Sequence, residues 1–489
     1  MTTRISRRAL VAGLAGTSVL PFSEWFAREA LAQPLSFSRI RYDVNSVAGR
    51  KMLVPYARAV EKMMRMSAQD PCSWTFQWYT HFVKGSTTKA AEISAIFGSG
   101  NSQRKTMAQD MWDTCQAHMG PPEDELAFFP WHRMFVFNFE SIIRKVSGVP
   151  TLTLPYWNYS SATTRAMPAA FRQPNSPLFR SSRNSGPNAG AQIPAAQVAL
   201  TALGEATYGP NGAASGFDQA IDFGIHGNVH VWVGNSQGMG SIPWSAFDPI
   251  FWMHHCNIDR LWASWNKAGR ANPAGSWSDE KFIFANDRCE RIEMKNGDVD
   301  DIAKLHYTYD RFEPVPGAIH AVGVTTPTVH LEAIAQGGAA AAASGPIALE
   351  VGPTRIMLRA PAQAVAGPTF AARMKALPAE GRIYLVMKDA AAAAQPEVVY
   401  NVYLDAPDNF RPSENDPHHV GTINFFAAAG TQAMPGSVPR TFSLDVTQQV
   451  RALAAVDQLS ANPAVTIVPA GQPSAAARPV IGQIQIVEQ

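Results

Sequence analysis

The sequence predicts an α+β multidomain protein, with a mainly α-helical part followed by a β-sandwich. Up to about residue 310, several segments carry apolar residues at the spacing of amphipathic helices. Beyond that point, short runs rich in β-branched and aromatic residues are separated by Pro, Gly, Asn and Asp, which is typical of antiparallel strands. We therefore expect a helical catalytic domain over residues 33–310, a linker over 311–345 and a β-sandwich over 346–489.

The N-terminus has the features of an export signal. Arg7 and Arg8 come directly before an apolar run, residues 9–20, which is too short to cross a bilayer. Residues 30–32 read Ala-Leu-Ala, the small-x-small pattern of a cleavage site. We expect residues 1–32 to be a signal peptide of the twin-arginine type, and the mature protein to be periplasmic or secreted. The alternative is a basic N-terminus that precedes an ordinary first helix.

Composition and charge narrow the range of partners. The formal net charge is only +2 and no long basic run occurs, so nothing predicts binding to nucleic acid or to an anionic membrane surface. No later apolar run is long enough for a membrane span. The sequence contains four cysteines, Cys72, Cys115, Cys256 and Cys289, which allow up to two disulfides in an exported protein and whose pairing stays open. The oligomeric state is also left open by the sequence.

Histidines are concentrated in the helical part. Helices are expected over 52–67, 75–84, 106–118, 130–146 and 248–268. Seven of the twelve histidines precede residue 260, on or beside an expected helix: His81, His118, His132, His226, His230, His254 and His255. His226 and His230 are four residues apart, so on a helix they share one face.

The histidine pair 254–255 points to a metal. It stands among apolar residues, where two imidazoles are costly unless something binds them. The zinc patterns Cys₄, Cys₂His₂ and HExxH are absent from the sequence. Neutral imidazoles with few carboxylates suit copper, zinc or iron, and copper fits an exported chain best.

Three segments carry a family resemblance, FFPWHRMFVFNFE (128–140), HGNVHVW (226–232) and DPIFWMHHCNIDRLW (248–262). They resemble the copper-binding signatures of the tyrosinase and polyphenol oxidase family, the type-3 dicopper proteins. The resemblance implies a four-helix bundle that holds two copper ions and uses O₂ as co-substrate. The implied ligands of the first copper ion are His81, His118 and His132. Those of the second are His226, His230 and His255.

The assignment of His118 departs from the family's usual spacing. The second ligand of the first copper ion usually lies nine residues before the position of His132, and here that position is Glu123. A short loop insertion accounts for the difference, because His118 is the only histidine between His81 and His132. The alternative is a first site with two histidines. Some family members join a cysteine to this ligand by a thioether, and Cys115 would correspond to it, with a free thiol as the alternative.

The resemblance also suggests roles on the last helix of the bundle. His254 would pack behind His255 instead of binding copper, and Phe251 would stack near the site. Asp259 would anchor the helix through a buried ion pair with Arg260.

Four residues near the second copper ion receive roles in the same way. Asp222 stands where plant members carry a glutamate that orients a water, so it would handle a water or the phenol proton. The alternative is an exposed Asp at a helix entry. Gly227 occupies a position where efficient monophenol hydroxylases often have Asn. Met239 and Ile242 would gate the substrate, with ordinary loop packing as the alternative.

The C-terminal part resembles the β domain of plant-type polyphenol oxidases, in the segments YNVYLDAPD, HVGTINFF and PVIGQIQIVE. In that family the domain covers the copper site, so we expect it to keep the protein latent and to insert an apolar side chain. The implied function is oxidation of o-diphenols to o-quinones, with ortho-hydroxylation of monophenols. Alternatives are a catechol oxidase without monophenolase activity, an o-aminophenol oxidase, or an oxygen carrier of the haemocyanin kind.

Overall fold

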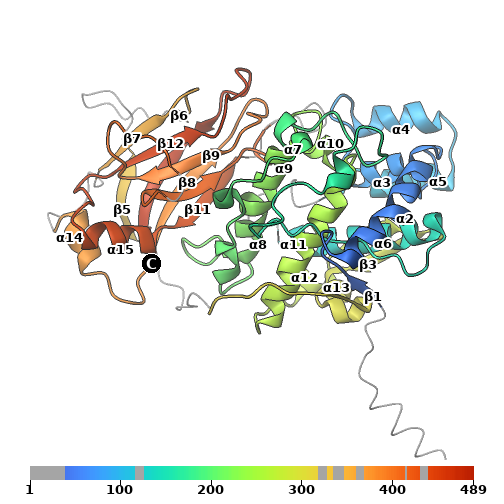
Figure 1. Ribbon diagram of the computed structural model, residues 1–489, viewed down its shortest axis with the longest axis horizontal. Coiled ribbons are helices and arrows are strands. Elements are labelled where there is room, and N and C mark those ends of the chain that lie inside the picture. The colour runs from blue at the N-terminus through green and yellow to red at the C-terminus, as the bar shows by residue number, and fades with distance from the viewer. Residues whose placement is uncertain are drawn as a thin grey trace, which may run out of the picture.

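The computed structural model describes residues 39–115, 126–317, 328–333, 346–359, 368–413, 416–429 and 439–489. Figure 1 shows two parts side by side, one built of helices and one built around a sheet from the last third of the chain. The predicted signal peptide, residues 1–32, and the predicted ligand His118 lie outside the described residues.

Long helices form the first part, and most lie close to their predicted positions. They are α2 (Val47–Met64), α3 (Trp74–His81), α6 (Phe128–Ser147) and α11 (Pro249–Lys267). The helix expected over 106–118 is shorter, because α5 (Gln103–Met111) ends at the C-cap Trp112. The other α-helices described in this part are α4 (Lys89–Phe97), α7 (Ser185–Ala189), α8 (Gly216–Ala220), α9 (Gly227–Val233), α10 (Ile242–Ser245), α12 (Ser276–Asp279) and α13 (Asn296–Val299).

Local sequence explains where the two central helices begin and end. The Asp248 side chain caps α11 by accepting from the backbone N–H of Ile250, and Pro249 occupies the first helical position. Helix α6 ends at Gly148, whose φ of +71° suits a glycine. These ends fix the length of the two helices that carry histidines 132, 254 and 255.

A π-helical segment, η6 (Ile221–His226), joins α8 to α9. Gly224 inside it has φ −92° and ψ −112°, which is not a helical conformation. The predicted helical face of His226 and His230 therefore begins with an irregular turn, and only His230 lies within α9. π-Helical turns of this kind are frequent at functional sites.

The last third forms one antiparallel sheet of eight strands in the order β10-β9-β12-β7-β5-β14-β8-β11. Its strands are β5 (Thr328–Ala333), β7 (Thr354–Arg359), β8 (Ile383–Ala390), β9 (Tyr400–Leu404), β10 (His419–Ile423), β11 (Arg440–Asp445), β12 (Ala464–Pro469) and β14 (Gln483–Glu488). Both halves of the sheet contribute to one apolar core, and Leu444 of β11 lies against Gly421 of β10. The sheet is thus folded over itself, with two faces packed as in a sandwich.

Strand β5 lies within the predicted linker 311–345. It pairs with β14 and β7, because the alternation of Val329, Leu331 and Ala333 suits a strand. Helices α14 (Phe370–Lys375) and α15 (Thr447–Ala455) pack on each other beside the sheet. The remaining strands pair as β6 (Ile347–Ala348) with β13 (Val480–Ile481), β2 (Lys281–Ala285) with β3 (Arg291–Lys295), and β1 (Arg39–Arg41) with β4 (Tyr307–Tyr309).

The two parts exchange side chains across their boundary. Phe426, from the loop after β10, is buried in the apolar core of the helices, whereas Phe223 of η6 is buried in the core of the sheet. A disulfide between Cys72 and Cys289 joins distant segments of the helical part. Among the described residues, no helix is both long and apolar enough to cross a membrane.

Candidate metal centre

Five elements of the helical part bring six histidines together. They are His81 at the end of α3, His132 in α6, His226 at the end of η6, His230 in α9, and His254 and His255 in α11. All six are at most 3% exposed. The ring centroids of His132 and His255 are 4.3 Å apart, those of His226 and His230 are 4.5 Å apart, and those of His81 and His132 are 5.8 Å apart.

Backbone carbonyls orient three of these rings. His132 Nδ1 lies 2.8 Å from the Phe128 carbonyl oxygen, and His230 Nδ1 lies 2.9 Å from that of Met239. The backbone of Ile242 hydrogen-bonds to His81. A ring that donates from Nδ1 keeps the lone pair of Nε2 for a metal, so the contacts of His132 and His230 select the tautomer that a metal site needs.

Asp222 lies against a fourth ring with both its backbone carbonyl, which accepts a hydrogen bond from it, and its carboxylate. His226 Nδ1 lies 2.8 Å from Asp222 Oδ1 and 3.2 Å from the Asp222 carbonyl oxygen. Asp222 is 5% exposed, so the alternative of an exposed Asp at a helix entry is wrong. A carboxylate on the remote nitrogen of a metal-binding histidine raises the basicity of the ligand.

Burial keeps the rings neutral. It lowers the pKa of His81 to about 3 and holds the pKa of His132, His230 and His255 well below the usual value. Within the part of the chain that the structure describes, His230 Nε2 and both ring nitrogens of His255 have no hydrogen-bond partner. Buried, neutral and unsatisfied nitrogens that converge on one point fit a copper ion, which accepts imidazole ligands.

His254 lies as close to the second group of histidines as His255 does. Nitrogen atoms of His226, His230, His254 and His255 all lie within 4.8 Å of one another. The Nδ1 atom of His254 is 2.9 Å from the hydroxyl of the buried Tyr159. This tyrosine was not identified from the sequence, because the two residues are far apart in the chain.

Cys115 lies against a different histidine from the expected one. Its Sγ atom is 3.6 Å from Nε2 of His132, and both residues form a group with His81 whose candidate ligand atoms lie within 4.8 Å of one another. The thioether considered for Cys115 involved His118, which is outside the described residues.

Phe251 contacts the site as expected. Its ring centroid is 4.1 Å from that of His255 and 5.2 Å from that of His81. The ring therefore fills space between histidines that come from different helices.

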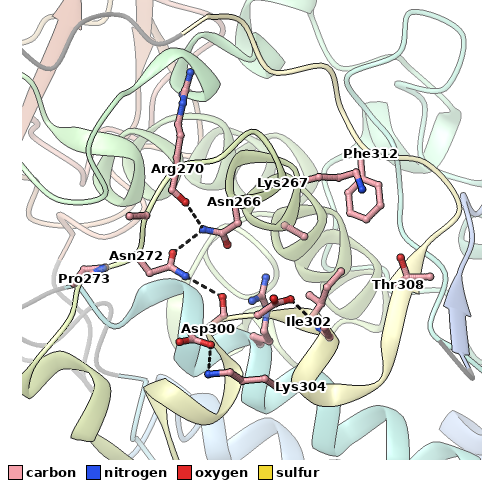
Figure 2. A pocket seen from close by; sticks show the side chains of 15 residues that line it. Asn266, Lys267, Arg270, Asn272, Pro273, Asp300, Ile302, Lys304, Thr308 and Phe312 are labelled. Atoms are coloured by element: carbon pink, nitrogen blue, oxygen red, sulfur yellow. Dashed lines mark hydrogen bonds and ion pairs between the residues drawn. The ribbon is translucent and has the colours of Figure 1, made fainter. Parts of the chain in front are cut away.

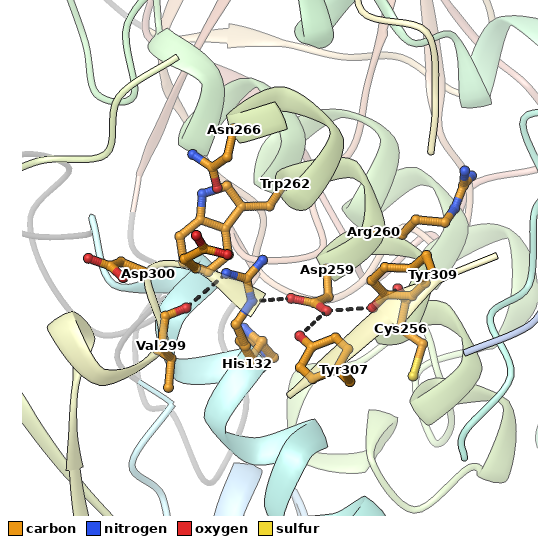
Figure 3. Close-up of polar contacts among 12 residues, drawn as sticks. His132, Cys256, Asp259, Arg260, Trp262, Asn266, Val299, Asp300, Tyr307 and Tyr309 are labelled. Atoms are coloured by element: carbon orange, nitrogen blue, oxygen red, sulfur yellow. Dashed lines mark hydrogen bonds and ion pairs between the residues drawn. The ribbon is translucent and has the colours of Figure 1, made fainter. Parts of the chain in front are cut away.

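The expected ion pair between Asp259 and Arg260 is wrong. Figure 3 shows that the Asp259 carboxylate contacts Tyr307 and Tyr309 instead. Arg133 also donates to this carboxylate. Adjacent helical residues point in different directions and so do not face each other.

The actual partners of these two charges tie the helical part together. Asp259 also accepts from Arg41 at 3.1 Å, and Arg41 in turn binds Glu140 at 2.9 Å. Arg260 binds Glu313 at 2.6 Å. Asp259 thus anchors α11 through β1 and α6, one turn away from His255.

The three residues predicted to line the substrate path are all buried. Gly227 is the first residue of α9, and a Cβ atom built on it would lie 2.5 Å from Oδ1 of Asn424 in the C-terminal part. The backbone of Met239 hydrogen-bonds to His230, and the backbone of Ile242 hydrogen-bonds to His81. Periodicity could not reveal these contacts, because a backbone carbonyl is present at every residue.

Phe426 is the side chain of the C-terminal part that reaches the histidines. Its ring stacks on His230, with centroids 4.2 Å apart and an interplanar angle of 15°, and its centroid is 5.7 Å from that of His226. The segment HVGTINFF pointed to the domain, but it contains two adjacent phenylalanines. Of these, Phe425 is buried in the sheet core.

A separate pocket of about 660 Å³ lies beside the end of α11 (Figure 2). Its lining includes Arg133, Lys267, Arg270, Asp300 and Lys304, and none of the six histidines. It is therefore distinct from the histidine cluster.

Comparison with known proteins agrees with this architecture. Residues 71–212 and 196–268 match the family model described as the common central domain of tyrosinase, and residues 338–489 match a domain of unknown function, DUF7868. Tyrosinase HcTyr1 of Hahella sp. is 32% identical over 292 residues, which cover 52% of this chain and 59% of that protein. The chloroplastic polyphenol oxidase of Malus domestica is 30% identical over 239 residues, 40% of either chain. The chain thus spans about two fifths to three fifths of these relatives.

Solved structures share the fold over most of the chain. The structure of latent apple tyrosinase aligns with a TM-score of 0.60 and 22% identity, covering 92% of this chain and 97% of that one. A functional unit of octopus hemocyanin aligns with a TM-score of 0.51 and 16% identity, covering 92% and 99%. A helical domain followed by a C-terminal β domain is therefore the fold of this chain.

Proposed function

Because residues 71–268 match the family model of the central domain of tyrosinase, we propose that the chain is a dicopper oxidase that uses O₂ to convert o-diphenols into o-quinones. The observation that carries the proposal is the cluster of buried histidines contributed by α3, α6, η6, α9 and α11. In the reaction two o-diphenols and one O₂ give two o-quinones and two waters.

The ligands divide into two groups of three. His81, His118 and His132 would hold one copper ion, and the other would be held by histidines 226, 230 and 255. Two copper ions side by side supply the two-electron exchange with O₂ that organic side chains cannot perform. The chain's own contribution is to keep the ligand rings neutral and oriented in a site that excludes water.

Other residues would act on the phenol. Asp222, held against His226, is the carboxylate best placed to handle a water or the proton of the phenol hydroxyl. Gly227, Met239 and Ile242 would border the substrate path near the second copper ion.

The C-terminal part, residues 346–489, would keep the enzyme latent. Support comes from Phe426, whose ring covers the face of His230. A phenol ring that approached the second copper ion would need the same space. Removal or displacement of this part would therefore open the site.

The test uses catechol, tyramine and an o-aminophenol, each as sole substrate, with the copper-loaded chain before and after limited proteolysis. We expect catechol oxidation that rises after cleavage. Quinone formation from tyramine alone would assign a tyrosinase, and its absence a catechol oxidase. Turnover of the o-aminophenol alone would assign the third alternative. Reversible O₂ binding without any turnover would contradict the proposal in favour of an oxygen carrier.

We also propose that the chain is exported through the twin-arginine route. The disulfide between Cys72 and Cys289 supports an oxidising compartment. Arg7→Lys combined with Arg8→Lys should leave the protein inside the producing cell. Export of this variant at the normal level would contradict the route.

A further inference from the structure

We infer that Asn424 is the residue that positions Phe426 over His230, and that residue 227 must be a glycine for this arrangement to form. The inference rests on the proposed function and specifies how the site is closed. One buried amide side chain, that of Asn424, would then control the contact between the sheet and the second group of histidines.

The Asn424 side chain makes hydrogen bonds in three directions. It is 3% exposed, and its Nδ2 donates to the Phe223 carbonyl oxygen at 2.7 Å and to Asn228 Oδ1 at 3.0 Å. Its Oδ1 accepts from the backbone N–H of Phe426 at 3.1 Å. Phe223 and Asn228 lie on either side of His226 in the chain, so one side chain spans this ligand.

The irregular turn in η6 provides the acceptor. Gly224 departs from helical φ and ψ, and the carbonyl of the preceding residue, Phe223, is then available to a donor from outside the helix. Asn424 satisfies this buried carbonyl. The turn that carries His226 is thus shaped to receive the C-terminal part.

Gly227 is required for close approach and not for backbone conformation. Its φ of −62° and ψ of −37° are ordinary helical values that any residue adopts. A Cβ atom at this position would lie 2.5 Å from Oδ1, 2.7 Å from Nδ2 and 2.9 Å from Cγ of Asn424. Asn424 cannot move aside without losing its hydrogen bonds, so alanine at position 227 would expel it.

The same loop is held from its other side. Gln395 Nε2 donates to the carbonyl oxygen of Phe426 at 2.9 Å, and Gln395 is 5% exposed. Asn424 and Gln395 therefore fix both the N–H and the carbonyl of Phe426. A fixed backbone at this residue explains the stacking of its ring on His230.

The experiment compares the full-length chain with Asn424→Ala, and with Asn401→Ala as the matched control. Asn401 is in strand β9 and bonds to Thr422 within the sheet. Two quantities are measured: the ratio of diphenolase activity before and after proteolysis, and the fraction of the C-terminal part that co-elutes with the helical part after cleavage. The second readout does not depend on copper or on turnover.

Asn424→Ala should raise the activity of uncut enzyme about tenfold and reduce co-elution, because it leaves buried acceptors unsatisfied. Its cleaved form should match the cleaved wild type, and Asn401→Ala should behave as wild type in both assays. Phe426→Ala should raise uncut activity while co-elution stays high. Unchanged latency and co-elution in Asn424→Ala would overturn the inference.

Gly227→Ala tests the second half of the inference by co-elution alone. We expect it to release the C-terminal part in the wild-type background and to add little in the Asn424→Ala background, where the three atoms that clash are gone. Full co-elution of Gly227→Ala, or additive effects, would overturn the glycine requirement. Absence of turnover in every copper-loaded form would reject the proposed function, while the co-elution results would still judge the Asn424 contact.

Discussion

Orientation of individual imidazole rings decides whether a histidine cluster can hold a metal. Here the Nδ1 atoms of His132 and His230 face backbone carbonyls, while His226 faces the carboxylate of Asp222. A charged acceptor makes its histidine a stronger donor to the metal than a carbonyl does. The ligand His226 should therefore contribute more to metal affinity than its neighbour His230.

Asp222→Asn should weaken binding at the second copper site about 10- to 100-fold, the usual effect of losing such a carboxylate. Copper retained per chain is measured during titration with a chelator. Asp279→Asn is the control, because the Asp279 side chain is 75% exposed. Retention equal to that of wild type in Asp222→Asn would show that the carboxylate does not tune the ligand.

Among individual residues, the sequence predicted more of the candidate metal ligands than of the groups that orient their rings. The motifs around His132, His226, His230 and His255 identified residues that the structure brings together. The groups that orient the rings were not predicted, because a backbone carbonyl such as that of Met239 has no sequence signature. The role of His254 stays a prediction, because its ring lies among the same group.

At the scale of elements, α6 and α11 are held together by buried charges. Asp259 is 4% exposed and compensates two arginines, Arg41 and Arg133, that are fully buried. Tyr307 donates a further hydrogen bond to it at 2.6 Å. The arrangement holds β1, β4 and both helices in one network.

Asp259→Asn should lower the free energy of unfolding by about 3–5 kcal/mol, because it leaves buried positive charge uncompensated. Denaturant unfolding of the metal-free chain measures this change without interference from copper. Glu293→Gln, which breaks the exposed pair with Lys281, should leave the free energy of unfolding close to that of the wild type, because solvent screens this pair. Similar losses in both variants would contradict the importance of the buried network.

Helix positions were predictable because apolar spacing and Pro or Gly at the ends are local signals. The partners of Asp259 were not, since Arg41 and Tyr307 are distant in sequence and only the tertiary fold brings them near. The irregular turn in η6 was not predictable either. It breaks the helical period, and the segment still reads as helix in the sequence.

At the scale of the whole molecule, the buried histidines make the metal-free fold sensitive to acid. Burial lowers the pKa of His81 to about 3 in the folded chain, whereas an unfolded chain takes up this proton near pH 6.5. Stability is therefore complete above about pH 6.5 and declines as the pH falls towards about 3. Each such histidine removes up to about 1.4 kcal/mol per pH unit.

Denaturant midpoints of the metal-free chain should therefore fall between pH 7 and pH 5. Bound copper should raise the midpoint throughout this pH range, because a metal that binds the folded chain stabilises it relative to the unfolded chain. Equal midpoints with and without copper would contradict metal binding by these rings. A midpoint that does not change with pH would contradict their burial as neutral groups.

The residue of the C-terminal part that covers the histidines could not be predicted from the sequence. The C-terminal strands and their family resemblance predicted a shielding domain, but not the residue that reaches the copper ligands. Phe426 and His230 are far apart in the chain, and their contact depends on how the helical part and the sheet, each with its own apolar core, pack together. Only the assembled molecule distinguishes Phe426 from its neighbour Phe425.

The most direct test of the dicopper assignment is the copper content of the folded chain after loading and removal of loosely bound metal. We predict two copper ions per chain, and one ion fewer in a His132→Ala variant that remains folded. A folded wild-type chain that retains no more than one copper ion would contradict the assignment.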